Sequence, residues 1–126
     1  MSKTILIVED NENNMMLVRD VLEMKGYAVL AATTGGEGVR IALQDLPDLI
    51  LMDIQLPDID GITALAQIRA SDAAQKIPVL AVSASVMQDE QIKIAASGFE
   101  AYITKPLNMK SFLATVEKFI GAANDK

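Results

Sequence analysis

The stretch Leu49-Ile-Leu-Met-Asp53 places an uninterrupted apolar run directly before an aspartate. Such a run predicts a central strand of a parallel sheet, because a strand buried on both faces needs no polar alternation. The following residues, 55–61, contain Pro57, two aspartates and a glycine, so they indicate a loop. The stretch therefore predicts a buried strand over residues 49–52 that delivers Asp53 to the edge of a sheet.

Apolar runs and helical spacings alternate along the chain in five strand–helix units. The other predicted strands are residues 4–8, 28–32, 79–82 and 101–103. The predicted helices start after residues 11–14 and stop at Gly26, span 39–46 before Pro47, span 62–68, run from about 87 to 96, and cover 109–120. Strands alternating with helices imply right-handed crossovers. The pattern predicts a doubly wound α/β domain whose five-stranded parallel sheet has the order 2-1-3-4-5, the flavodoxin-like arrangement.

Spacing and composition also predict which side chains fill the core. Four apolar residues within 39–46 recur at intervals that place them on one helix face, which we expect to be buried: Val39, Ala42, Leu43 and Leu46. Only five residues are aromatic, so methionine should fill gaps in the core. The methionines assigned to the core on this basis are Met15, Met16, Met24, Met52 and Met87.

The composition bounds the class of protein. A chain of 126 residues fits one domain, predicted over residues 1–121 with a short tail at 122–126. The absence of cysteine and histidine excludes disulfides, a phosphohistidine, a Ser-His-Asp triad and a histidine-ligated zinc site. A net charge of −6 argues against nucleic acid as the main partner. No signal peptide and no apolar run of the roughly 20 residues that a membrane span needs are present, so we expect a cytoplasmic protein without a membrane partner.

Polar residues follow four of the predicted strands. Glu9 and Asp10 come after the first strand, Asp53 after the third, Ser83 after the fourth and Lys105 after the fifth. In an open α/β sheet, ligands bind beyond the carboxyl ends of the strands. Each residue taken alone also fits an ordinary turn, cap or solvated charge. Those separate explanations leave the acidic cluster unexplained, whereas one shared site accounts for all of it.

Three carboxylates and one ammonium would make this site anionic. Two carboxylates about 4 Å apart repel by roughly 4 kcal/mol at an effective dielectric near 20, and solvent exposure reduces that value. Such a site should raise a pKa or bind a cation. Oxygen ligands without His or Cys favour a hard ion, and a site completed by waters and a phosphate suits Mg²⁺. A carboxylate beside Mg²⁺ and a lysine is also a competent nucleophile for phosphorus, and its product would be an acyl phosphate.

Five segments occur in an order and spacing that are highly specific together. They are Ile5-Leu-Ile-Val-Glu-Asp-Asn11, Pro47-Asp-Leu-Ile-Leu-Met-Asp-Ile-Gln-Leu-Pro57, Asp60-Gly61, Ile77-Pro-Val-Leu-Ala-Val-Ser-Ala84 and Ala101-Tyr-Ile-Thr-Lys-Pro-Leu107. Over essentially the whole chain they resemble the receiver domains of two-component response regulators, most of all stand-alone receivers and those of hybrid kinases. The resemblance implies a signalling protein rather than an enzyme, one that catalyses only its own phosphoryl transfer and a slow autodephosphorylation.

The resemblance implies how the acidic residues act. Asp53 would be the phosphoacceptor. The implied ligands of Mg²⁺, for which Mn²⁺ could substitute, are Asp10, Asp53 and the backbone carbonyl of Gln55. Glu9 stands where aspartate is more frequent in the family, and it would order a metal-bound water or ligate weakly.

The resemblance also implies a switch. Lys105 would contact the phosphoryl group, with a cis bond to Pro106. Ser83 would be the switch hydroxyl and Tyr102 the switch aromatic, although Tyr102 alone also fits a half-buried strand aromatic. Serine at position 83 keeps the hydroxyl of the more frequent threonine but loses the methyl group that stiffens χ1.

The implied phosphoryl donor is a histidine kinase or a histidine phosphotransfer protein, and the implied target is a downstream protein. Only a short tail follows the last predicted helix. We therefore expect the signal to leave through a surface, either to a partner or as a relayed phosphoryl group. The fourth helix, fifth strand and fifth helix form the preferred surface, and the first helix is the alternative.

Three other functions fit parts of the pattern. A phosphohydrolase with an aspartyl nucleophile would place a second acid two residues later, where this chain has Gln55. A flavodoxin-like FMN carrier needs a phosphate loop rich in hydroxyls and amides, and Glu9 and Asp10 would repel that phosphate. A pseudo-receiver, which binds partners without being phosphorylated, remains open although every residue of the chemistry is present.

Overall fold

Strands and helices alternate throughout the computed structural model, which describes residues 3–84, 88–105 and 107–121. The strands are β1 (Thr4–Val8), β2 (Ala28–Ala32), β3 (Leu49–Asp53), β4 (Val79–Ser83) and β5 (Ala101–Thr104). The helices are α1 (Glu12–Met24), α2 (Gly35–Asp45), α3 (Gly61–Arg69), α4 (Gln88–Ala96) and α5 (Met109–Ile120). None of these helices is long and apolar enough to cross a membrane.

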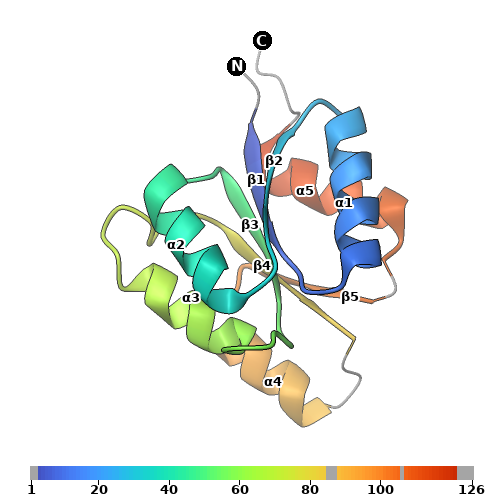
Figure 1. Cartoon of the computed structure of the whole chain (residues 1–126). Coiled ribbons are helices and arrows are strands. Elements are labelled where there is room, and N and C mark those ends of the chain that lie inside the picture. Colours follow the sequence, from blue (N-terminus) through green and yellow to red (C-terminus); the bar gives the residue numbers. More distant parts are fainter. Residues whose placement is uncertain (1–2, 85–87, 106, 122–126) are drawn as a thin grey trace.

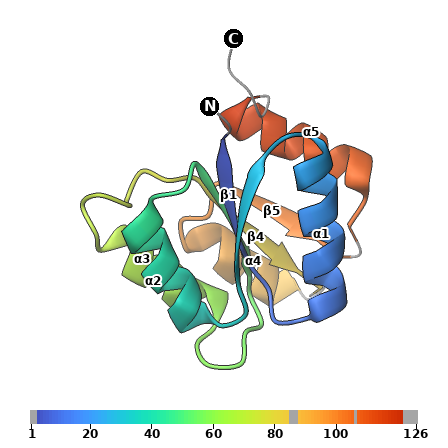
Figure 2. The same ribbon diagram turned by 45° about the horizontal axis from the view of Figure 1, so that its top comes forward.

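All strand pairs are parallel, and the sheet order is β2-β1-β3-β4-β5. Helices α1 and α5 cover one face of the sheet, and α2, α3 and α4 cover the other (Figure 1, Figure 2). The predicted doubly wound fold and its strand order are therefore confirmed. The carboxyl ends of all five strands lie at one edge, which is where the predicted site should form.

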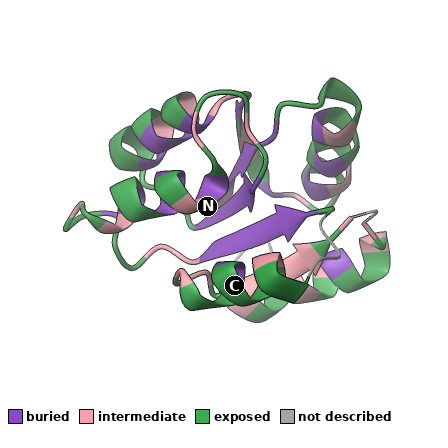
Figure 3. Cartoon of the chain, turned by 90° about the horizontal axis from the view of Figure 1, so that it is seen from below, coloured by how far each residue is buried: buried purple, intermediate pink, exposed green. Residues whose placement is uncertain are grey.

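The core is made by the central strands, which are buried on both faces (Figure 3). Alternate residues of β3 point to opposite sides, because side chains along a strand have a period of two. Leu49 and Leu51 join the apolar cluster under α1 and α5, whereas Ile50 and Met52 join the one under α2 and α3. The apolar run that predicted β3 is thus explained by two-sided burial.

Local chemistry sets most helix boundaries. The side chains of Asn11, Thr34, Asp60 and Asn108 cap α1, α2, α3 and α5, each accepting a hydrogen bond from a backbone N–H of the first turn. Gly26 follows the end of α1 with φ of 93°, a conformation that glycine adopts without steric cost. This agrees with its prediction as a stop signal.

Two predictions about the core were partly wrong. Leu46 is 46% exposed, because α2 ends at Asp45 and Leu46 has a left-handed φ of 48°, which removes it from the helix face. Leu43 lies within α2 but is 40% exposed, so the buried face of this helix includes Val39 and Ala42 but not Leu43. Among the methionines, Met15 and Met52 are buried, but Met16 and Met24 lie on the outer side of α1. The buried stripe of α1 is Met15, Val18 and Leu22, and a residue next to Met15 points away from it. Met87 lies outside the described residues.

The two ends of the described chain meet at one segment. The hydroxyl of Tyr27 donates to the carbonyl of Gly121 at 2.8 Å, and the N–H of Ala28 donates to the carbonyl of Lys3 at 2.9 Å. Tyr27 is buried, and this burial raises the pKa of its hydroxyl, with a smaller contribution from Glu117. A tyrosine hydroxyl is protonated at neutral pH even without this shift, so it can donate this hydrogen bond.

Candidate metal centre

The strand ends bring the predicted residues together. Glu9 directly follows β1, Asp53 is the last residue of β3, Ser83 is the last residue of β4 and Lys105 directly follows β5. Asp53 was predicted just beyond its strand, but it is the last residue of β3 and pairs with Val82 of β4. The next residue, Ile54, also bonds to β4, since its N–H donates to the Val82 carbonyl at 3.1 Å. The backbone of Asp53 is thus held in the sheet by its pairing with β4.

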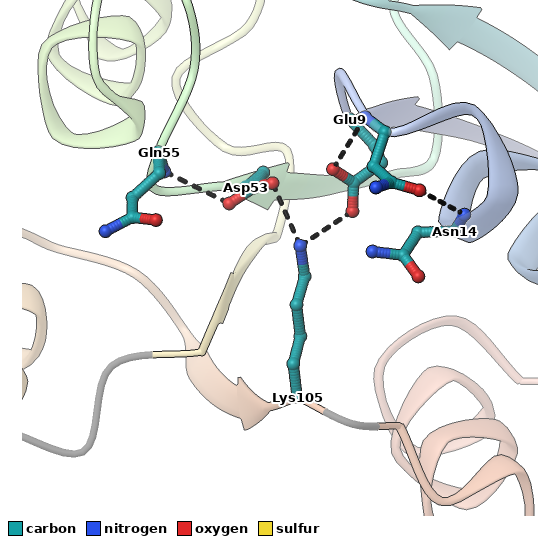
Figure 4. Close-up of polar contacts among 6 residues, drawn as sticks. Glu9, Asn14, Asp53, Gln55 and Lys105 are labelled. Carbon is teal, nitrogen blue, oxygen red and sulfur yellow. Dashed lines mark hydrogen bonds and ion pairs between the residues drawn. The ribbon is translucent and has the colours of Figure 1, made fainter.

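Lys105 connects the two buried carboxylates of this edge (Figure 4). Its Nζ donates to Glu9 Oε1 at 2.8 Å and to Asp53 Oδ2 at 3.0 Å. The second oxygen of each carboxylate accepts from a backbone N–H: Asp53 Oδ1 from Gln55 at 3.0 Å and Glu9 Oε2 from Asn11 at 3.2 Å. All four carboxylate oxygens therefore have a hydrogen-bond donor, as buried charges require.

The pKa shifts of Glu9 and Lys105 reflect burial and the charges of their neighbours. Burial raises the pKa of Glu9, and the adjacent Asp53 raises it further, although Lys105 acts in the opposite direction. Burial alone would lower the pKa of Lys105, but its hydrogen bonds to Glu9 and Asp53 outweigh that effect and raise it. Lys105 is thus firmly cationic, while the acidic side still carries more negative charge than one ammonium neutralises.

The donor atoms fit a hard cation. One carboxylate oxygen from each of Glu9, Asp10 and Asp53 lies within 4.8 Å of the other two. Asp10 is exposed, whereas the other two are buried. These residues line a hollow of about 630 Å³ together with Gln55 and Pro57. Oxygen-only ligands and room for water are what Mg²⁺ prefers, so the residues present fit the predicted ion.

Two features of the site were not predicted from the sequence. Glu9 is buried and forms the closer ion pair with Lys105, so it orients the lysine as well as adding charge. Asn14, in the first turn of α1, lines the same hollow, and its side chain lies beside Glu9 and Lys105 (Figure 4). The strand-end pattern could not reveal Asn14, because a helix brings it to the site.

Ser83 and Tyr102 lie on the α4 side of the sheet. Tyr102 pairs with Ala81 and contacts the cluster around Ile94 of α4. Ser83 is two residues after Ala81 and therefore points to the same face, where it is buried. The N–H of Lys105 donates to the Ser83 carbonyl at 2.9 Å, which connects the end of β4 to the backbone of the lysine. The predicted cis bond involves Pro106, which lies outside the described residues.

The fold and this site define a class of protein. The family described as "Response regulator receiver domain" matches residues 5–117, and the chain belongs to that family. Over 123 residues the chain is 42% identical to the polar-differentiation response regulator DivK of Brucella anthropi, covering 98% of this chain and 100% of that protein. DivK of Brucella ovis is 41% identical over the same length.

Solved structures agree with this assignment. The receiver domain of a sensor histidine kinase from Pseudomonas aeruginosa, with a magnesium ion coordinated in its active-site cleft, has a TM-score of 0.90 and 31% identity, covering 97% of this chain and 100% of that one. A CheY-like receiver protein from Methanospirillum hungatei has a TM-score of 0.86 and 29% identity, covering 94% and 93%. CheY4 of Vibrio cholerae, at 23% identity and a TM-score of 0.88, shares the fold.

Proposed function

We propose that this receiver accepts a phosphoryl group on Asp53 in the presence of Mg²⁺ and acts as a single-domain response regulator comprising residues 1–121. The observation that carries the proposal is the carboxylate of Asp53, held by Lys105 at 3.0 Å beside Glu9 and Asp10. A buried structural aspartate needs one cationic partner, but it does not need two further acids. Membership of the receiver family supports the same reading.

Each residue has a distinct part in the proposed reaction. Asp10, Asp53 and the backbone carbonyl of Gln55 would hold Mg²⁺, or Mn²⁺ in its place, with Glu9 acting through a water or as a weak ligand. When bound, the ion neutralises charge on the phosphoryl oxygens. A carboxylate oxygen of Asp53 attacks phosphorus, the bond from phosphorus to the donor breaks, and an acyl phosphate remains. Lys105 then donates to a phosphoryl oxygen in place of the carboxylate.

The proposed donor is a histidine kinase or a histidine phosphotransfer protein, a partner that membership of the receiver family supports. The acyl phosphate would be removed slowly by autodephosphorylation or relayed onward. We propose that the cytoplasm is its compartment. The downstream protein would recognise the face formed by α4, β5 and α5, which adjoins Ser83, Tyr102 and Lys105.

The labelling experiment is direct. We expect protein incubated with Mg²⁺ and acetyl phosphate to gain the mass of one phosphoryl group, and hydroxylamine, which cleaves acyl phosphates, to remove it. Omitting Mg²⁺ and adding EDTA should stop the reaction. Intact mass spectrometry measures all three conditions. Protein that gains no mass in Mg²⁺ would be a pseudo-receiver, and the proposal would be wrong.

We further propose that Ser83 and Tyr102 form the switch. The Ser83 hydroxyl would donate to the phosphoryl group, and Tyr102 would move inward over Ala81, whose small side chain is the register partner of Tyr102. Phosphorylation then shifts an existing equilibrium, because the phosphoryl group makes contacts in one state only. An allosteric coupling of this kind is typically about 1–3 kcal/mol, which sets the expected gain in partner affinity.

Ser83→Ala should separate labelling from switching. The variant keeps Asp53, Lys105 and the acidic cluster, so it should still be phosphorylated. It lacks the hydroxyl that would donate a hydrogen bond to the phosphoryl group. The NMR shift changes around Tyr102 on phosphorylation should therefore be smaller than in wild type. If the Tyr102 signals move equally in both proteins, the two residues are not coupled.

A further inference from the structure

Asp58 links the loop after β3 to the start of α2. Its Oδ1 accepts from the N–H of Gly35 at 2.8 Å, and its Oδ2 accepts from the N–H of Gly36 at 2.8 Å. These are the first two residues of α2, and the local cap Thr34 accepts only the later N–H of Glu37. A carboxylate from a distant loop therefore uses both oxygens on N–H groups that the helix itself leaves without acceptors.

Those bonds also keep Asp58 charged. The N–H of Gly36 is the main cause that lowers the pKa of Asp58, followed by the N–H of Ile59. The helix N-terminus carries a partial positive charge that favours an anion there. Asp58 is thus an ionised anchor at neutral pH, and its charge is directed at α2.

The neighbouring residue reinforces the contact. A Cβ added to Gly35 would lie 2.5 Å from Ile59 Cγ1 and 3.1 Å from the Ile59 carbonyl oxygen, so only glycine allows this approach. Ile59 in turn packs against the apolar cluster between the sheet and helices α2 and α3. The loop is therefore held against α2 by the two hydrogen bonds to Asp58 and by the packing of Ile59 on Gly35.

The other end of the loop is fixed at the sheet. The N–H of Gly61 donates to the Ile54 carbonyl at 2.9 Å. A Cβ on Gly61 would lie 2.5 Å from the Asp53 carbonyl oxygen, which again requires glycine. Gln55 lies between this closed base and the Asp58 anchor, and its N–H donates to Asp53 Oδ1 at 3.0 Å.

We propose that Asp58 is a positioning residue for the metal centre. A backbone carbonyl has no side-chain torsion of its own, so only the path of the loop can aim the Gln55 carbonyl at the ion. Asp58 fixes that path at its far side by holding residues 58–59 on α2, while Gly61 fixes the near side. This inference rests on the proposed function, because it assigns the Gln55 carbonyl as a ligand.

Three variants test the proposal through Mg²⁺ affinity of the unphosphorylated protein, measured by calorimetry, and through the Mg²⁺ dependence of labelling by acetyl phosphate. Asp58→Ala removes the anchor and should weaken Mg²⁺ binding by about tenfold, the lower end of what lost support around a metal ligand costs. Labelling should slow at limiting Mg²⁺ and recover at saturating Mg²⁺. Asp58→Asn keeps one acceptor oxygen but loses the second, because its NH₂ group cannot accept from an N–H, so its affinity should fall between those of Asp58→Ala and wild type.

Asp48→Ala is the matched control. Asp48 also accepts from a backbone N–H, that of Thr4 at 2.7 Å, but at the opposite edge of the sheet, so its loss should leave Mg²⁺ affinity unchanged. Thermal unfolding in EDTA shows whether each variant is folded at the assay temperature. If Asp58→Ala does not fold, Asp58→Asn carries the test, and its Mg²⁺ affinity must fall below that of wild type for the proposal to stand.

The outcomes separate this proposal from the function it rests on. Wild type that neither binds Mg²⁺ nor is labelled contradicts the proposed function itself. Wild type that binds and is labelled, with Asp58→Ala indistinguishable from it, overturns only the positioning role. Weakening by Asp58→Ala that disappears at high ionic strength would assign the effect to long-range charge, which salt screens, and would likewise overturn the positioning role.

Discussion

Asp53→Asn should abolish phosphorylation completely. The amide oxygen of asparagine is a poor nucleophile and cannot form an acyl phosphate with the side chain intact. We therefore expect no mass gain with Mg²⁺ and acetyl phosphate over a time in which wild type is labelled.

The asparagine variant should fold, which makes the result interpretable. Its side-chain oxygen can still accept from the Gln55 N–H, and Lys105 retains Glu9 as a partner. Asp48→Asn is a suitable control, since Asp48 is exposed at the other edge of the sheet. This variant protein should be phosphorylated to the same extent as wild type. Full labelling of Asp53→Asn, with the phosphoryl group mapped to Asp10 or another acid, would contradict the assignment.

Asp10→Asn should weaken Mg²⁺ binding more than Glu9→Gln does. Asp10 is the exposed carboxylate of the cluster, whereas Glu9 is buried and bound to Lys105 at 2.8 Å. A charge about 4 Å from a unit cation contributes about 4 kcal/mol at an effective dielectric of 20, and exposure reduces this. We expect a loss of affinity of at least about tenfold for Asp10→Asn, since the removal of a proposed direct ligand should cost no less than the removal of a supporting residue.

Calorimetric titration of the unphosphorylated protein measures this difference. The chain contains no tryptophan, so NMR shifts of the amides near Asp53 are the better spectroscopic readout. Labelling of Asp10→Asn should need a higher Mg²⁺ concentration to reach the same rate. Two results would count against the metal site: equal Mg²⁺ affinity in both variants, and label transfer that continues undiminished in EDTA.

The fold was largely predictable because its signals are local. Residues 49–52 are apolar without interruption, and the structure buries them on both faces. The gathering of Glu9, Asp53, Ser83 and Lys105 at one edge followed from the parallel topology alone. Leu46 was misplaced because helical spacing does not show where the backbone leaves the helix, and here it does so at a left-handed residue.

The contacts that orient the site could not be read from the sequence. The burial of Glu9 depends on Lys105, which lies 96 residues away. Asp58 was predicted only as part of a turn, because nothing near it indicates that α2 needs its carboxylate. The periodicity of apolar residues shows which face of a helix or strand is buried, but it does not show which residues, distant in the sequence, contact that element.

The meeting of both ends of the described chain, Lys3 and Gly121, at Tyr27 and Ala28 has a practical consequence. This segment lies just before and at the start of β2, whereas Asp53 ends β3, so the described ends and the proposed phosphoacceptor occupy opposite edges of the sheet. A five-residue strand separates the edges by roughly 15 Å. A fluorescent reporter or an affinity handle attached at either end would leave the reactive edge open, so the molecule can be tethered, imaged or circularly permuted while its chemistry is followed.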